Sequence, residues 1–67
     1  MPIIFVILVE GRSLDEKRAL TRGITDAAVE ALKVDPGEVR VILRNIARED
    51  FANGGVLKCD QSLPAGK

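Results

Sequence analysis

Two runs of apolar residues frame the first two thirds of the chain. The first, PIIFVILV at residues 2–9, is rich in β-branched side chains and lacks period-two alternation, which indicates a strand with both faces buried. The second, VRVILRNI at residues 39–46, predicts another strand. The turn signal Asp35-Pro36-Gly37-Glu38 precedes it, and we expect Asp35 to cap a short turn that starts at Pro36.

Helical periodicity fills the stretch between the two runs. Ser13 and Glu16 match the capping-box pattern S-x-x-E, so we expect a helix from about Leu14 to Leu32. The residues expected on its apolar face are Leu20, Ile24, Ala27, Ala28 and Ala31. The residues expected to face mostly water are Lys17, Arg18, Arg22, Asp26 and Glu30.

Strand, helix and strand in this order predict one α/β domain over residues 1–67, a single β-α-β unit with parallel strands. Asn53-Gly54 is a strong tight-turn dipeptide, and Val56-Leu57 supplies one arm of a short C-terminal β-hairpin. The polar tail, from about residue 60 to 67, is expected to be mobile. One helix covers only one face of a two-stranded sheet, so the other apolar face must meet another subunit of an oligomer.

Length and composition support that conclusion. A chain of 67 residues is marginal alone, and its single Cys59 excludes an internal disulfide. Ten basic and ten acidic residues give no net charge, and only Phe5 and Phe51 are aromatic, which argues against nucleic-acid binding. The first apolar run is too short to cross a membrane, so a soluble cytoplasmic protein is expected. No Cys/His cluster has zinc spacing, so no metal is expected.

Candidate chemistry rests on Pro2, Arg12 and Arg40, because the chain has no histidine. Arg12 follows the first strand, Arg40 lies in the second, and a guanidinium binds carboxylate in a bidentate way. The residues alone favour another interpretation for each arginine, a surface residue paired with Glu38 or another acid. Arg44 shares the strand face of Arg40. It either widens a basic patch there or is a charge at a subunit interface.

Pro2 has two interpretations. Proline is tolerated at the first residue of a strand. If Met1 is removed, as cells usually do before proline, Pro2 instead exposes a secondary amine. Burial and nearby arginines lower the pKa of such an amine, and a base poised near neutral pH transfers protons efficiently. Cys59, with no histidine to activate it, is expected to be an incidental thiol.

Several segments together resemble the 4-oxalocrotonate tautomerase family. They are Met1-Pro2-Ile3, Glu10-Gly11-Arg12-Ser13, Val39-Arg40-Val41-Ile42, and Phe51 followed by Gly54-Gly55. The resemblance implies that Pro2 is the general base and acid, that Arg12 binds the distal carboxylate, and that Phe51 is an apolar wall. It implies that Arg40 holds the other carboxylate and the 2-oxygen, reaching into a neighbouring subunit's site.

The resemblance also implies a 1,3-allylic proton transfer on a dienol such as 2-hydroxymuconate, without metal or organic cofactor. The implied assembly is a homohexamer arranged as a trimer of dimers, and the usual setting is the breakdown of aromatic compounds.

Two alternatives stay open. Relatives on this scaffold hydrate 3-haloacrylates with an acidic residue near the Phe51 segment, a role for which Glu49 or Asp50 is available. However, Asn53 stands where that acid is expected, and an amide is not a base. The other alternative is a non-catalytic subunit of a hetero-oligomer, which retention of Met1 would favour.

Overall fold

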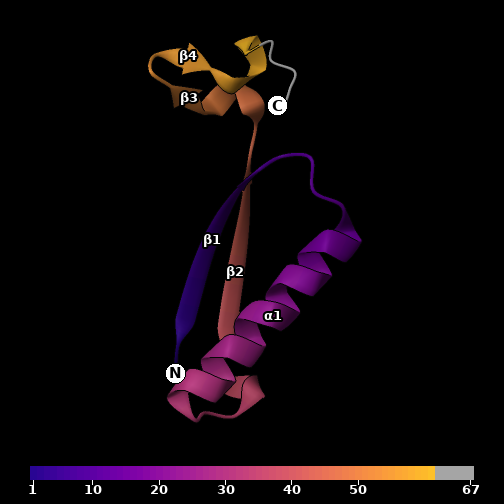
Figure 1. Cartoon of the computed structure of the whole chain (residues 1–67), viewed down its shortest axis with the longest axis vertical. Helices are drawn as coiled ribbons and strands as arrows, with labels where there is room; N and C mark the ends of the chain where they lie inside the picture. The colour runs from indigo at the N-terminus through magenta and orange to yellow at the C-terminus, as the bar shows by residue number, and fades with distance from the viewer. Residues whose placement is uncertain (62–67) are drawn as a thin grey trace.

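A β-α-β unit forms the body of the molecule, as predicted. A computed structural model describes residues 1–61, with strand β1 (Ile3–Val9), helix α1 (Leu14–Leu32) and strand β2 (Arg40–Ile46) in that order (Figure 1). β1 and β2 pair in parallel, with Ile3 opposite Arg40 and Val9 opposite Ile46. The tail predicted to be mobile falls mostly on residues 62–67, which lie outside the described residues.

The bounds of α1 agree with the prediction because its ends carry local signals. The Oγ of Ser13 accepts the backbone N–H of Glu16 at 3.1 Å, and the Glu16 carboxylate accepts that of Ser13 at 2.9 Å. These two bonds are the reciprocal capping box. At the other end Lys33 turns the chain in the left-handed region, with φ 59°, and its N–H binds the carbonyl of Val29.

Both strands begin one residue later than predicted. The Val39 N–H closes a 3-10 turn, η1 (Pro36–Glu38), at the Pro36 carbonyl, so β2 starts at Arg40. Asp35 caps this turn with its backbone carbonyl, which accepts the Glu38 N–H at 2.9 Å, and the predicted side-chain cap is absent. Pro2 lies just before β1.

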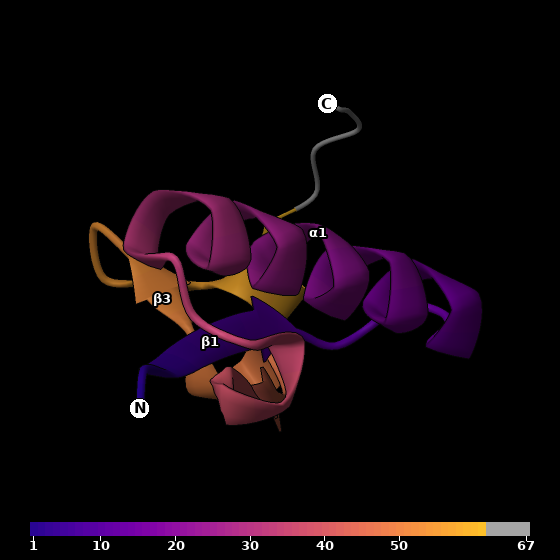
Figure 2. The ribbon, with the colours of Figure 1, turned by 90° about the horizontal axis from the view of Figure 1, so that it is seen from below.

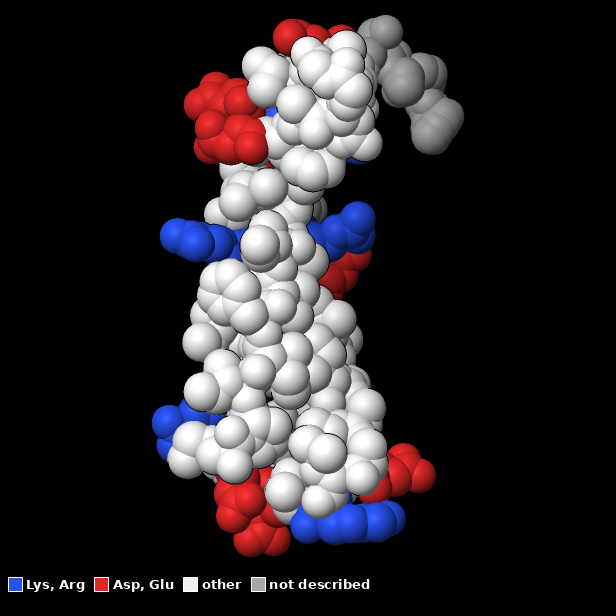
Figure 3. All heavy atoms as spheres, turned by 90° about the vertical axis from the view of Figure 1, so that its left-hand side faces the viewer, with Lys and Arg blue, Asp and Glu red and all other residues white. Residues whose placement is uncertain are grey.

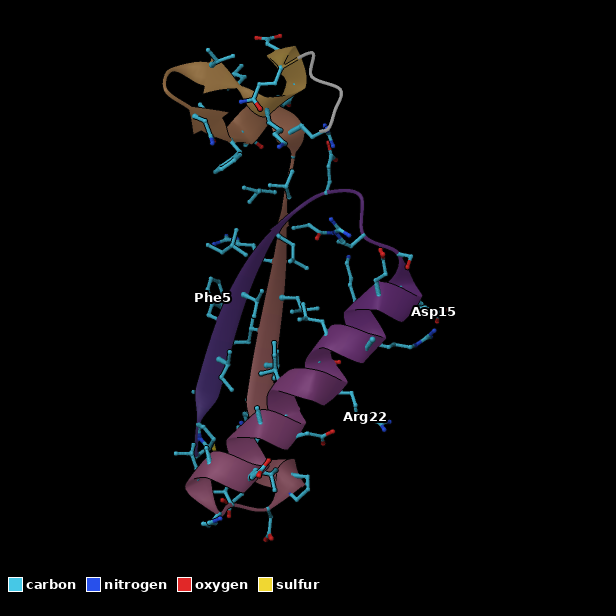
Figure 4. All side chains as sticks on the ribbon, viewed as in Figure 1. Phe5, Asp15 and Arg22 are labelled. Carbon is cyan, nitrogen blue, oxygen red and sulfur yellow. The ribbon has the colours of Figure 1, made fainter. Side chains whose placement is uncertain are left out.

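The two faces of the sheet differ in burial. On β1, Ile4, Val6 and Leu8 are half-buried, whereas Phe5 is 52% exposed and its neighbours on that face are exposed too. Figure 2 shows α1 lying along one side of β1, and in Figure 4 Phe5 points from β1 away from α1. Within a single subunit the helix covers one face of the strand, as predicted, and burial of the other face by a second subunit stays a prediction.

α1 meets the sheet through fewer residues than the periodicity predicts. Three of the expected residues, Leu20, Ile24 and Ala28, are half-buried, but Ala27 and Ala31 are exposed. The sheet is too narrow to cover a full stripe, because two strands lie about 4.8 Å apart and a helix is about 10 Å wide. Asp15 and Arg22 point away from the sheet (Figure 4).

A short antiparallel hairpin follows β2, as predicted. A 3-10 turn, η2 (Arg48–Asp50), leads into β3 (Ala52–Asn53) and β4 (Val56–Leu57), and η3 (Lys58–Asp60) follows. The turn is Gly54-Gly55, with φ of 58° and 83°, so the prediction of Asn53-Gly54 was one residue early. Asn53 pairs with Val56 in the ladder, and the two glycines take the positive φ angles that such a two-residue turn requires.

Among the described residues none is buried, so the subunit has no core of its own. The molecule measures 43 × 21 × 17 Å, and its radius of gyration of 15.3 Å exceeds the value of about 11 Å for a compact chain of this length. The uncovered sheet face carries Ile3, Phe5, Ile7 and Ile42, and Arg40 and Arg44 lie on the same face of β2. In the view onto this side, uncharged residues fill the middle and basic side chains project at the edges (Figure 3). This face favours a partner subunit, because burying it removes exposed apolar area from water.

Candidate active site

One end of the sheet carries Pro2 and Arg40. The carbonyl of Pro2 accepts the backbone N–H of Arg40 at 3.0 Å, and Pro2 is half-buried. The Arg40 side chain stands on the uncovered face, in register with Ile3, and is exposed. In residues 1–61 it forms no ion pair, so the proposed pairing with Glu38 is not seen. Its guanidinium therefore keeps all its donors for a ligand or a partner.

The opposite end carries Arg12 and Phe51. Arg12 lies in the loop after β1, where Gly11 takes a φ of 119°. Glu10 ties this loop to the segment before Phe51: its N–H binds the Ile46 carbonyl at 2.8 Å, and its carboxylate accepts the Arg48 N–H at 3.1 Å. The ring of Phe51 remains 37% exposed.

The length of β1 separates these two groups. Its seven residues span about 20 Å at about 3.3 Å per residue. Pro2 and Arg12 of one subunit therefore cannot contact the same small substrate. The structure places Pro2 and Arg40 at one end of β1, and Arg12 and Phe51 at the other.

Arg12 has an acidic neighbour, as its structural interpretation requires. Its Nη1 lies 3.6 Å from the Oε2 of Glu16, and the side chains are 61% and 55% exposed. The Ser13 backbone N–H, followed by the Arg12 charge, holds the pKa of Glu16 below its usual value. An exposed ion pair of this kind is weak, so the guanidinium remains able to bind a second carboxylate.

A cavity of about 260 Å³ lies beside Arg12. Its lining residues are Leu8, Arg12, Glu16, Lys17 and Leu20. Lys17 is half-buried there, so the prediction that it faces water was wrong. Its spacing of three residues from Leu20 is the sequence signal that places it on the sheet-facing side of α1.

Other features add little to this site. A hollow of about 430 Å³ between α1 and η1 includes none of the four candidate residues. In the described part of the chain, His, Cys, Asp and Glu do not form a group of three or more that could hold a metal. Nor does any helix in that part combine the length and apolar character needed to span a bilayer.

A model of the family described as tautomerase enzyme matches residues 2–61, a range that includes the candidate residues Pro2, Arg12, Arg40 and Phe51. The chain belongs to the tautomerase family. A probable tautomerase of Listeria innocua is 38% identical over 60 residues, which cover 90% of this chain and 98% of that protein. The family assignment thus extends over nearly the whole tautomerase domain.

Solved structures agree with the fold of this member of the tautomerase family. A crystal structure of a 4-oxalocrotonate tautomerase homologue has a TM-score of 0.87 and 42% identity, covering 92% of this chain and 98% of that one. A heterohexamer 4-oxalocrotonate tautomerase from Chloroflexus aurantiacus has a TM-score of 0.85 and 30% identity, covering 91% and 98%. A trans-3-chloroacrylic acid dehalogenase structure is more distant, with a TM-score of 0.75 and 25% identity over 84% and 97%.

Proposed function

We propose that this tautomerase moves a proton on a 2-hydroxymuconate-like dienol carboxylate, with the amine of Pro2 as general base and acid. The observation that carries the proposal is the position of Pro2, half-buried and hydrogen-bonded to the backbone of Arg40, in a chain of the tautomerase family. Removal of Met1 frees the amine. A neighbouring subunit then excludes water, and both burial and the arginines lower the pKa of the amine.

The reaction is a proton relay through one nitrogen. The Pro2 nitrogen accepts the proton of the 2-hydroxyl while the electron pair shifts along the diene. The same nitrogen returns the proton to the far carbon, which gives the conjugated 2-oxo-alkenoate. Arg40 stabilises the charge that develops on the 2-oxygen and binds the adjacent carboxylate, and Arg12 binds the distal carboxylate.

Each complete site combines more than one subunit. Because Pro2 and Arg12 lie at opposite ends of β1, a neighbour running in the opposite direction brings its Arg12 to the Pro2 of the first subunit. The Arg40 side chain leaves the uncovered face, so it reaches into a neighbour's site. The exposed ring of Phe51 supplies an apolar wall. We propose a homohexamer, a trimer of dimers, as the assembly that completes the sites.

The intact mass and the activity of the purified protein test the proposal together. We expect a mass that corresponds to loss of Met1, and rapid ketonisation of 2-hydroxymuconate followed by absorbance. Pro2→Ala keeps a small residue after Met1, and we expect it to lower kcat about a hundredfold or more while the oligomer remains. Normal activity in Pro2→Ala would sink the mechanism. A mature protein that keeps Met1 would favour the non-catalytic subunit instead.

The dehalogenase alternative requires an acidic residue in or near the hairpin that accepts a proton from water. Asn53, in β3, has an amide side chain that cannot accept the proton of a water molecule, whereas Glu49 and Asp50 are exposed in η2. We therefore expect no halide release from 3-chloroacrylate above the uncatalysed rate. Halide release faster than ketonisation would reverse the assignment.

A further inference from the structure

Lys17 is the one residue of the cavity beside Arg12 that neither the sequence nor the proposed mechanism gives a task. It is half-buried, it follows Glu16 in the second turn of α1, and it forms no ion pair within residues 1–61. A lysine stem packs well on apolar surface while its ammonium reaches the polar rim. Leu8 and Leu20 provide that apolar surface here.

The cavity has an apolar floor and a charged rim. Arg12 and Lys17 contribute two positive charges, and Glu16 contributes one negative charge. Both carboxylate oxygens of Glu16 are already engaged, one by the Ser13 N–H at 2.9 Å and the other by Arg12 at 3.6 Å. Glu16 thus orients the guanidinium, and the rim keeps a net positive charge for one further carboxylate.

We infer that Lys17 is a second cation of the distal-carboxylate subsite and makes this site select dicarboxylates over monocarboxylates. The inference rests on the proposed function, because it takes Arg12 as the ligand of the distal carboxylate. The guanidinium binds two oxygens in its fork, whereas the ammonium of Lys17 is a compact point charge on a flexible stem. The chain of the ligand lies against Leu8 and Leu20.

Calorimetric titration of the assembled protein tests this subsite without relying on turnover. The probes are trans,trans-muconate, with two carboxylates, and sorbate, the same diene with one. We expect Lys17→Met to weaken muconate binding about tenfold relative to sorbate, because a hydrogen bond to a charged group is lost. Methionine keeps an unbranched apolar stem and a high helix propensity, so α1 is retained, as circular dichroism will show.

Arg18→Met is the matched control. It removes the same charge from the adjacent helix position, but Arg18 lies outside this cavity and pairs with Asp15 at 2.8 Å. We expect its ratio of muconate to sorbate affinity to equal that of the unmodified protein. An equal ratio in Lys17→Met and Arg18→Met would overturn the role of Lys17. Absence of ketonisation in the unmodified protein would instead overturn the proposed function, and the affinity ratio would still decide the subsite.

Discussion

Arg12 and Arg40 lie at opposite ends of the sheet, and the proposed mechanism gives them different tasks. Arg40 stands in register with Ile3 beside Pro2, and Arg12 lies in the loop that leaves β1. In the proposed mechanism each guanidinium binds a carboxylate, and only Arg40 also meets the oxygen on which charge develops. Arginine is suited to both tasks because it offers a planar fork of donors.

Single substitutions at these arginines separate the two tasks. We expect Arg12→Ala to raise KM for 2-hydroxymuconate more than it lowers kcat, because it removes binding at the distal carboxylate. We expect Arg40→Ala to lower kcat about a hundredfold, because it removes a charge that stabilises the transition state. Steady-state kinetics on substrates with and without carboxylates provide the measurement. Equal losses on both kinds of substrate would contradict these assignments.

The capping box shares a residue with the candidate site, because Glu16 takes part in both. Glu16 closes the box with Ser13 and also lies 3.6 Å from the Arg12 guanidinium. Its folded-state pKa is lowered from 4.5, so its contribution to stability is fully present above that value and is lost as the pH falls toward the lower folded value. The box therefore stabilises α1 at neutral pH and weakens in acid.

Glu16→Gln isolates this contribution, because glutamine also completes a capping box. We expect the free energy of unfolding to fall less between pH 6 and pH 3 in Glu16→Gln than in the unmodified protein, as measured by denaturant titration. Glu30→Gln is the control, since the Glu30 carboxylate has no hydrogen bond or ion pair within the described residues. If the free energy of unfolding falls equally in the unmodified protein and both variants, the lowered pKa of Glu16 contributes nothing to stability.

The sequence predicted those elements whose signals are local. Ser13 and Glu16 fix the start of α1 by themselves, so the helix bounds were correct. The turn at Gly54-Gly55 was not predicted, because Asn53-Gly54 is an equally strong turn signal. The pairing of Asn53 with Val56 in the hairpin is what places the turn at Gly54-Gly55. The open face that carries Phe5 was predicted, because one helix covers only one face of the sheet. The burial of Lys17 was not predicted, because it depends on how α1 packs against the sheet. Pro2 and Arg12 both belong to the segments that resemble the family, but the length of β1 separates them within one subunit.

At the scale of the whole molecule, we expect folding to depend on assembly, because one sheet face is open and no described residue is buried within one subunit. We expect Phe5→Asp to shift the protein to smaller species in sedimentation and to lower its helical signal, because a charge enters the apolar face and no described residue is buried within one subunit. Arg22→Asp places the same side chain where α1 points to solvent (Figure 4), and it should leave the assembly unchanged. A fully assembled Phe5→Asp variant would place the interface elsewhere.

The sharing of each site between subunits is tested most directly by mixing two impaired variants. Pro2→Ala and Arg12→Ala are unfolded together, refolded, and assayed with 2-hydroxymuconate well below KM. A mixed interface then contains one unmodified site and one site with both substitutions, so random mixing should restore about a quarter of the normal sites. Activity well above that of either parent is the predicted result. A mixture no more active than its parents would contradict a site that joins the Pro2 of one subunit to the Arg12 of another.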